Sequence, residues 1–461
     1  RAVKELGSLA NQLGRQRTLS ETYGASGWDL TFFDQKRIGD WEYALGVNFL
    51  NQHLSYVTIA GARKRDHPLS FSYHEPWWPA YRLMNDYFGR LSLVLSRGQQ
   101  VNRILVIEPT TSAWMYYSPA EKNETFEKIA ADFQNFVHCL ERKQIEYDLG
   151  SEFVLKGYGQ FEGKKLRVGQ RAYDLVVLPP GIENLEPATA KLLQDFLKGG
   201  GRVISWGKNE LLEGGKPSSL GDEFRDLGDF EQLESHSLSS DNLAAIFSSR
   251  VNPGIEFSQL RDEDMLFHQR RQYKDGQILF LANISPEKSA SGEIKLKGRS
   301  LEKWDLMSGQ TGYFPGERKG SQMRFKFNLK PGESLLLAVY NRKVPGVAAI
   351  QANNKDEEKT QNNIKLKPEL IRRLDPNVLT IDYCDLILPG RMEKSLYFYE
   401  AQKRVFNFHG FDRNPWDSAV QFQDSLIVRN HFPPDSGFRA EFHFSVLPGV
   451  DLSSLKLVVE R

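Results

Sequence analysis

Two glutamates near the N-terminus are the side chains best placed for chemistry. Glu21 follows a short run at 17–20 that predicts a buried strand, and aromatic residues and glycines come directly after it. Glu75 lies in the ring-rich stretch 72–78 (SYHEPWW). Two carboxyl groups flanking a glycosidic bond can cleave it, because one protonates the leaving oxygen while the other attacks the anomeric carbon or activates water. We therefore predict that Glu21 and Glu75 are catalytic.

Each of these acids also has a structural interpretation. Glu21 could be a surface residue of a loop between a strand and a helix. Glu75 could supply negative charge to the first turn of the helix expected to begin near Pro79. A third acid, Asp29, fits a helix N-cap better than a catalytic role.

Imidazole and indole side chains close to the two acids are candidates for binding a sugar. His53 and His74 could hydrogen-bond to hydroxyl groups or hold a carboxylate in place. Trp28, Trp77 and Trp78 could stack on the C–H faces of a pyranose. The alternative is ordinary packing of the rings beneath a long loop and a structural role for each histidine.

The sequence contains no motif for a metal or a nucleotide cofactor. His-x-x-Glu-His, Cys-x-x-Cys and P-loop patterns are all absent. The two cysteines, Cys139 and Cys384, fall in different expected domains, which argues against a disulfide framework or a cysteine metal site. We expect no cofactor, and nothing in the sequence supports a structural calcium ion.

The elements around the predicted site alternate between helix and strand. This order suits the last quarter of a (β/α)8 barrel, with Glu21 after the seventh strand and His53 after the eighth. Two such units cannot close a barrel, so we expect an open apolar edge within residues 1–98. The expected elements are a helix at 2–14, a strand at 17–20, a helix at 31–45, a strand at 46–50, a loop at 55–78 and a helix at 79–95.

The middle of the chain, residues 99–250, repeats strands and helices at the spacing of a doubly wound parallel sheet. The turn after its first strand, residues 108–112 (EPTTS), lacks a glycine-rich phosphate loop, so nucleotide binding is not expected. No nucleophile elbow is visible either. We predict a doubly wound α/β domain with a structural or oligomeric role.

The hydrophobic period changes to two after this region. Residues 251–345 alternate apolar and polar positions between glycine turns, which predicts a small antiparallel β-sandwich. Residues 346–366 are polar and charged, a composition typical of a linker. Residues 367–461 predict a second sandwich of carbohydrate-binding, galactose-binding-like type, which is expected to be incomplete and to end on a strand at 455–459.

Composition limits the classes of protein that the chain can represent. Its 461 residues are too many for one ordinary core, so several domains are expected. Lysine and arginine total 60 against 59 acidic residues, and the net charge of +1 gives no support for nucleic-acid or anionic-membrane partners. Aromatic residues make up 12%, which leaves many rings for sugar stacking. No apolar run reaches the length of a membrane span.

The first residues open directly on a helical pattern, without a helix-start signal or a signal-peptide pattern. We therefore expect the chain to be a piece of a longer polypeptide, divided inside a domain. A targeting segment would lie upstream, so the sequence leaves the localisation unknown.

Five segments together resemble glycoside hydrolase family 106, the α-L-rhamnosidases. The resemblance implies a barrel, a flavodoxin-like or amidotransferase-like domain and then β-sandwiches, in a secreted or periplasmic enzyme. It also implies an inverting exo-glycosidase that removes terminal sugars with a glutamate acid and a glutamate base. The family's strand-end glutamate would map to Glu21, with its partner upstream of this sequence. The segments are 20–28 (SETYGASGW), 40–56, 64–78, 280–285 (FLANIS) and 304–310 (WDLMSGQ).

Two rival interpretations stay open. Family 42 β-galactosidases share a barrel followed by an amidotransferase-like domain, although the region after the linker argues against them. A non-catalytic carbohydrate-binding or scaffold protein that keeps part of a barrel is the rival from a different class. In every case the expected partner is an oligosaccharide or glycoside, with oligomerisation through the α/β domain as a further option.

Overall fold

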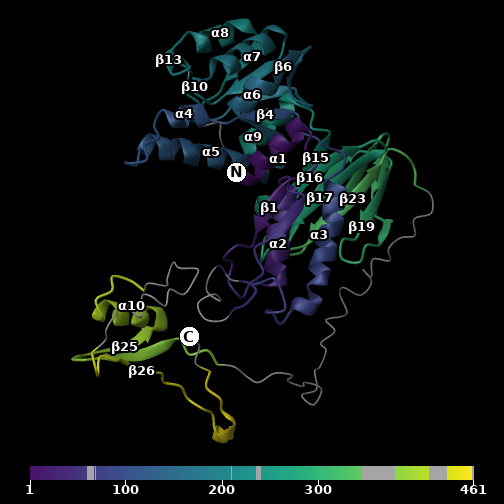
Figure 1. The fold of residues 1–461 in the computed structure, drawn as a ribbon. Helices are drawn as coiled ribbons and strands as arrows, with labels where there is room; N and C mark the ends of the chain where they lie inside the picture. Colours follow the sequence, from purple (N-terminus) through teal and green to yellow (C-terminus); the bar gives the residue numbers. More distant parts are fainter. Residues whose placement is uncertain are drawn as a thin grey trace. The chain divides into compact units, whose positions relative to one another are not determined.

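The structure is a computed structural model that describes residues 1–59, 67, 69–208, 210–234, 240–344, 379–414 and 433–458. The chain separates into two compact units, 1–356 and 357–460. The first unit combines α/β and all-β parts, so the chain is a multidomain protein of mixed class (Figure 1). The predicted linker at 346–366 lies outside the described residues.

The N-terminal part of the first unit alternates helices with two parallel strands. Its elements are α1 (Ala2–Leu13), β1 (Leu19–Thr22), α2 (Phe32–Ala44), β2 (Phe49–Gln52), the 3-10 turn η2 (Trp78–Ala80) and α3 (Arg82–Leu95). β1 and β2 pair in register from Leu19 opposite Phe49 to Thr22 opposite Gln52. Thr31 caps α2, because its side chain accepts a hydrogen bond from the Asp34 amide at 3.1 Å.

Both strands begin later than the sequence pattern predicts. Thr18 and Asn48 precede the ladder and bond to side chains or loops instead: the Thr18 amide donates to Asn48 Oδ1 at 3.2 Å, and Asn48 Nδ2 donates to the Gln16 carbonyl at 2.9 Å. Polar side chains that satisfy neighbouring backbone groups compete with strand pairing. As a consequence Glu21 is the third of the four residues of β1, close to the strand's carboxyl end but within the strand rather than after it.

Residues after α3 form a five-stranded parallel sheet with helices on both faces (Figure 1). The strand order is β14-β11-β9-β4-β5, so the chain reverses direction across the sheet between β4 and β9. The strands are β4 (Ile104–Ile107), β5 (Tyr147–Gly150), β9 (Leu175–Leu178), β11 (Arg202–Ser205) and β14 (Asp229–Gln232). The helices are α4 (Thr110–Trp114), α5 (Glu124–Arg142), α6 (Glu152–Tyr158), α7 (Pro187–Lys198), α8 (Leu220–Leu227) and α9 (Ser240–Arg250).

Alternate side chains of the parallel strands enter separate cores. Leu105 and Val176 pack with α6, α7 and α8, whereas Val106 and Val177 pack with α5 and α9. The α/β domain also contains two short three-stranded sheets. One consists of β6 (Gly159–Glu162), β7 (Lys165–Val168) and β8 (Arg171–Tyr173). The other consists of β10 (Asn184–Leu185), β12 (Leu212–Glu213) and β13 (Lys216–Pro217).

Helix α1 covers the edge strand β5 of the parallel sheet. Ser8 Oγ accepts a hydrogen bond from the Leu149 amide at 2.9 Å, and Gln12 Nε2 donates to the Leu149 carbonyl at 2.9 Å. Two side chains of a helix thus bond to the backbone groups that a neighbouring strand would have used, which protects a sheet edge.

The rest of the first unit is a sandwich of two antiparallel sheets. One sheet has the order β15-β18-β22-β21 and the other β20-β19-β23-β17-β16-β3. The strands are β3 (Gln99–Gln100), β15 (Ile255–Arg261), β16 (Leu266–Tyr273), β17 (Gly276–Asn283), β18 (Ala290–Lys297), β19 (Ser300–Trp304), β20 (Thr311–Tyr313), β21 (Glu317–Lys319), β22 (Gln322–Leu329) and β23 (Ser334–Tyr340). β3 joins this sheet through Arg271 opposite Gln100, although the sequence places residues 99–100 at the start of the α/β domain.

Two buried joints connect the parts of the first unit. Arg270 Nε donates to Glu146 Oε1 at 2.8 Å and links the sandwich to the α/β domain. Lys36 on α2 donates to Asp40 at 2.6 Å and to Ser334 Oγ on β23 at 2.9 Å, which links helix α2 to the sandwich.

The second unit contains a three-stranded antiparallel sheet, one α-helix and the 3-10 turn η6 (Leu452–Ser454) in its described residues. The strands and the α-helix are β24 (Tyr383–Leu388), β25 (Arg391–Tyr397), α10 (Phe398–Phe408) and β26 (Arg439–Glu441), with the sheet order β25-β24-β26. Residues 455–458 are not a strand, which corrects the expectation for that segment. The carbohydrate-binding sandwich stays a prediction.

Candidate functional site

Glu21 lies on the open face of the β1–β2 sheet. Side chains alternate between the two faces of a strand, and in parallel strands the paired residues share a face. Leu19 and Glu21 therefore lie on the same side as their partners Phe49 and Asn51. All four are exposed, Leu19 to 50% and Phe49 to 48%. The predicted catalytic carboxylate thus shares this face with the Asn51 side chain and with the exposed apolar side chains of Leu19 and Phe49.

The opposite face of the same sheet holds a buried acid that sequence reasoning missed. Glu42 of α2 is 7% exposed and accepts hydrogen bonds at 2.8 Å from both Ser20 Oγ and Thr22 Oγ1. Burial raises the pKa of Glu42, and the two hydroxyl groups oppose that shift. The sequence signal for this buried acid was the pair of polar residues Ser20 and Thr22 in a strand covered by a helix, because buried hydroxyl groups need a hydrogen-bond partner.

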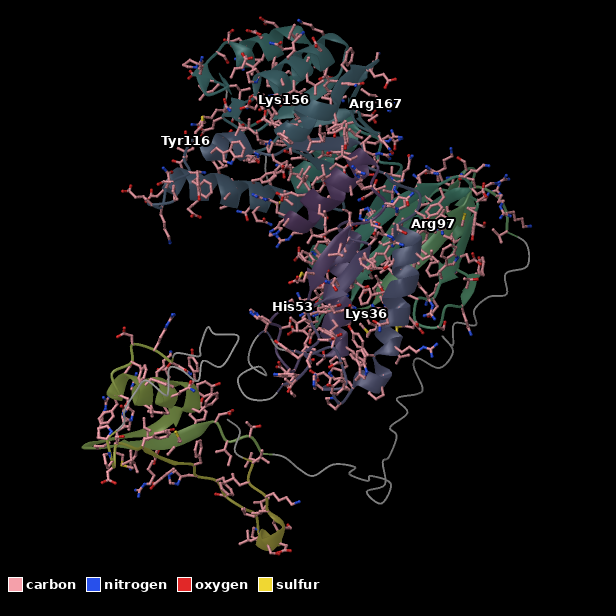
Figure 2. All side chains as sticks on the ribbon, viewed as in Figure 1. Lys36, His53, Arg97, Tyr116, Lys156 and Arg167 are labelled. Carbon is pink, nitrogen blue, oxygen red and sulfur yellow. The ribbon has the colours of Figure 1, made fainter. Side chains whose placement is uncertain are left out.

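The segments that follow β1 and β2 lie together at the carboxyl ends of the strands. The His53 amide donates to the Thr22 carbonyl at 2.9 Å, and a Cβ on Gly24 would lie 3.7 Å from the His53 ring. His53 Nδ1 is buried and has no hydrogen-bond partner among the described residues. His53 is labelled in Figure 2. Buried polar atoms normally have a hydrogen-bond partner, so the partner of this nitrogen lies outside the described residues.

Glu75 is a buried carboxyl group in the loop that precedes η2. It is 5% exposed, and its Oε1 has no hydrogen-bond partner within the described part of the chain. Burial raises the pKa of the Glu75 carboxyl, which favours the protonated form. The first turns of η2 and α3 contain no acid, so the interpretation of Glu75 as a helix charge is wrong.

His74 is held by the serines of its own loop. Its Nδ1 lies 3.0 Å from Ser70 Oγ and 2.9 Å from Ser72 Oγ, and its ring centroid lies 4.3 Å from that of Tyr73. The Tyr73 ring is 73% exposed. His74 therefore orders the loop that carries Glu75, and its predicted contact with a sugar stays a prediction.

The three tryptophans differ in their exposure. Trp77 is partly buried, with its ring centroid 5.3 Å from Phe32 and 5.1 Å from Tyr81, so packing explains it. Trp28 also packs against this core. Trp78 is 39% exposed and stacks on Tyr81, with 5.7 Å between the ring centroids. Among the three, Trp78 offers the most accessible face to a sugar.

The predicted residues form two groups. His53 joins the strand ends near Glu21, whereas Glu75, His74 and Trp78 belong to the loop before α3. In the described ranges no hydrogen bond or ion pair joins Glu21 to Glu75. The same ranges hold no group of three or more His, Cys, Asp or Glu side chains that could bind a metal. Their helices are all too short or too polar to cross a membrane.

Comparisons with known proteins point to carbohydrate enzymes. No protein-family model matches the chain. A protein of Formosa agariphila, provisionally named a beta-glucuronidase, is 25% identical over 324 residues, or 66% of this chain and 25% of that protein. The structure of a rhamnosidase from Novosphingobium sp. PP1Y is 18% identical, with a TM-score of 0.55 over 84% of this chain and 35% of the rhamnosidase. A beta-galactosidase from Rahnella sp. R3 is 11% identical, with a TM-score of 0.45 over 73% of this chain and 57% of the galactosidase.

This chain corresponds to only part of the length of each of these proteins. This chain spans about a quarter of the curated relative and about a third of the rhamnosidase. The likeness to the rhamnosidase shows a shared fold over most of the present chain. The score for the galactosidase is too low to support an argument.

Proposed function

We propose that this chain is part of a glycoside hydrolase, and that residues 1–98 are the last two βα units of its (β/α)8 barrel. The side on which Glu21 lies carries the proposal. In such barrels the helices cover the outer face of each strand, the inner face lines the barrel interior, and the active site lies at the carboxyl ends of the strands. Ser20 and Thr22 contact α2, so Glu21 and Asn51 belong to the inner face.

Glu21 is proposed as the base or nucleophile of the reaction. Its side chain is exposed on the open face of the small sheet, where a substrate could reach it, as either role requires. Asn51 lies opposite it in register and can orient the carboxylate or a sugar hydroxyl group. A Glu21 carboxylate about 6.5–9.5 Å from the acid would imply inversion, and about 5–5.5 Å would imply retention.

Glu75 is proposed as a proton donor on the loop above the same strand ends. A buried carboxyl group with a raised pKa holds its proton to a higher pH and can give it to a leaving oxygen. The family resemblance instead places the acid upstream of this sequence. Replacement of Glu75 separates these two assignments, because only the first predicts a loss of the alkaline limb of the pH–rate profile, where the general acid gives up its proton.

Terminal α-L-rhamnosides are the proposed substrates. The family resemblance and the fold shared with the rhamnosidase support this choice. β-Glucuronides are the second candidate, because the relative with 25% identity over 324 residues is named for that activity. Trp78 and His53 would contact the sugar, one through its exposed ring face and the other through the ring nitrogen that has no partner in the described residues.

The test is hydrolysis of a panel of aryl glycosides by the full-length parent polypeptide. The panel contains the α-L-rhamnoside, the β-D-glucuronide and the β-D-galactoside of one chromophore. We expect turnover of the rhamnoside, with inversion at the anomeric carbon when the released sugar is followed by NMR. Turnover of the glucuronide alone would replace the proposed substrate. A folded parent that binds glycans but cleaves none of the panel would favour the non-catalytic alternative.

A further inference from the structure

Three arginines lie where α3, the α/β domain and the sandwich meet. Arg97 follows the end of α3, Arg171 begins β8 and Arg271 lies on β16. They belong to the end of α3 opposite η2, and therefore not to the strand ends that carry Glu21. Figure 2 labels Arg97 and His53, which lie well apart.

Arg171 and Arg271 both bond to the segment 97–100, which begins with Arg97. Arg271 Nε donates to the Arg97 carbonyl at 2.6 Å, and Arg271 Nη2 donates to the Gly98 carbonyl at 3.1 Å. Arg171 Nη1 donates to Gln99 Oε1 at 3.2 Å. Gly98 has φ +66°, and a Cβ there would lie 2.5 Å from the Gln272 carbonyl oxygen, so the segment is pressed against β16.

This cluster has no neutralising acid in the described part of the molecule. None of the three arginines forms an ion pair there, whereas the neighbouring Arg167 pairs with Glu162. Arg171 Nε is buried and has no hydrogen-bond partner. Burial lowers the pKa of Arg271 to about 10; the Arg171 charge acts in the same direction, and Tyr273 opposes it. Like charges held close together in a partly buried place favour the binding of an anion.

Guanidinium groups are well suited to bind an anion, the kind of partner that this cluster lacks. Each presents five N–H donors in a planar fork that matches the oxygens of a carboxylate, sulfate or phosphate group. Arg271 uses two of its donor nitrogens on carbonyl oxygens, and Arg171 uses one on Gln99. The remaining donors, including the buried Arg171 Nε, have no carbonyl or carboxylate partner in the described residues.

We propose that Arg97, Arg171 and Arg271 form a binding site for an oxyanion at this junction. The bound group is a carboxylate or a sulfate, either as a free ion or as a substituent of an acidic sugar. The site does not depend on glycosidase activity, since it is separate from the strand ends of the barrel-type units. A bound anion would join three parts of the first unit through one set of charge-assisted hydrogen bonds.

The test measures anion binding by the whole chain, with sodium sulfate and sodium D-glucuronate as probes. Titrations are made by calorimetry at constant ionic strength, with chloride as the balancing anion, because surface electrostatics alone depend on salt. We expect saturable binding in the native chain. Arg171→Gln and Arg97→Gln should each weaken it by about tenfold or more, the scale of one lost charge-assisted contact. Arg271 is left intact, because it also holds the carbonyl groups of the turn.

Arg167→Gln is the matched control, since it removes one arginine from the adjacent strand β7 but leaves the cluster complete. It should bind sulfate as the native chain does. Binding of sulfate alone would assign a small inorganic anion, and binding of glucuronate as well would assign a sugar acid. Absence of saturable binding for both probes, or equal affinity in the native chain and in folded Arg171→Gln and Arg97→Gln variants, would overturn the proposal. Neither readout involves glycoside turnover, so this result stands apart from the test of the proposed function.

Discussion

The β1–β2 sheet and strand β17 of the sandwich are covered by the same helices but differ in their other faces. All eight residues of β17 are buried: Leu279 faces the second sheet of the sandwich, and Phe280 faces the core shared with α2 and α3. In the small sheet, Leu50 enters that shared core, whereas Leu19 and Phe49 stay about half exposed. Both faces of β17 are thus covered within this chain, whereas one face of the small sheet is exposed.

This difference separates residues that maintain the fold from residues available for function. A side chain buried between two layers contributes mainly to stability, and its replacement should be felt in the free energy of unfolding. A side chain on the open face contributes little to the stability of this chain. Such a side chain is therefore available for catalysis. Four predictions test the distinction, in order of decreasing expected effect.

The largest effect is expected from Glu21→Gln in the full-length parent. The substitution keeps the size of the side chain but removes its charge and basicity. We expect turnover to fall by about 10²–10⁴-fold, the scale of a lost acid–base contribution. The melting temperature should not change, because the exposed carboxylate supplies little packing.

Glu121→Gln is the control for that measurement, since Glu121 is an exposed acid of the α/β domain far along the chain. Its turnover should equal that of the native enzyme. Near-normal turnover in Glu21→Gln, with an unchanged melting temperature, would make Glu21 an ordinary surface residue and remove the centre of the proposed function.

Phe280→Ala and Phe49→Ala compare the two sheets directly. In this chain we expect Phe280→Ala to cost about 3–5 kcal/mol of unfolding free energy, because it opens a cavity in the shared core. Phe49→Ala should cost less than about 1 kcal/mol, since that ring is already half exposed. Urea denaturation measures both, and equal losses would contradict the comparison.

The full-length parent sharpens the same test. If upstream strands close a barrel over Phe49, its replacement should cost about 3 kcal/mol there. A Phe49→Ala cost that is as small in the parent as in this chain would mean that the open face stays uncovered.

The joint between Arg270 and Glu146 predicts a loss of stability in acid. Burial opposes ionisation of Glu146, but the Arg270 charge and hydrogen bonds prevail and lower the pKa of Glu146 to about 2. The folded pKa lies below the unfolded value of about 4.3, so this stability is present above about pH 4.3 and is lost as the pH falls toward 2. The contribution is roughly 2–4 kcal/mol.

Glu146→Gln checks that assignment by urea denaturation between about pH 2 and 6. The variant should be less stable than the native chain at about pH 6 and should lose less stability on acidification. A native-like slope of stability against pH in Glu146→Gln would show that other groups account for the acid loss. Glu263→Gln, at a more exposed pair with Lys143, is the control.

The smallest effect is expected at Ser20, on the covered face of the small sheet. Ser20→Ala removes one of the two hydroxyl donors to the buried Glu42 and should cost about 1–2 kcal/mol at neutral pH. Burial raises the folded pKa of Glu42, so the stability that the buried carboxyl group provides is fully present below the unfolded pKa and is lost as the pH rises through the folded pKa. The Ser20 hydroxyl group opposes this loss, because its hydrogen bond lowers the pKa of Glu42 and stabilises the ionised carboxylate. Ser20→Ala should therefore cost more at high pH than at low pH; an unchanged cost across this range would contradict the role of the hydroxyl group.

Sequence patterns predicted element types better than boundaries. Continuous apolar runs such as Val106 with its neighbours identify strands that are buried on both faces, and glycine turns separate the strands of the sandwich. The start of β1 was missed because Thr18 bonds to Asn48, a contact across the chain that no local pattern contains. β3 was missed because a pair of glutamines has no strand signal of its own; its partner is Arg271, far along the sequence.

The candidate site shows the same division. The position of Glu21 near a strand end follows from residue types alone, but the face on which it lies depends on the partner of Ser20 on α2. The burial of Glu75 depends on how its loop folds over the core, and Trp77 and Trp78 are adjacent in sequence yet differ in exposure for that reason. Pairing of side chains across the fold, rather than residue type, decides these roles.

The cover that α1 gives to β5 limits where this polypeptide can be divided. A cut after residue 98 looks natural from the sequence, because it separates the barrel-type units from the α/β domain. It would release Ser8 and Gln12 from the backbone of Leu149, although β3 would stay in one piece with β16. The edge of β5 would then face water, and such edges pair readily with other chains. The excised α/β domain should aggregate unless a cut keeps α1 with the parallel sheet.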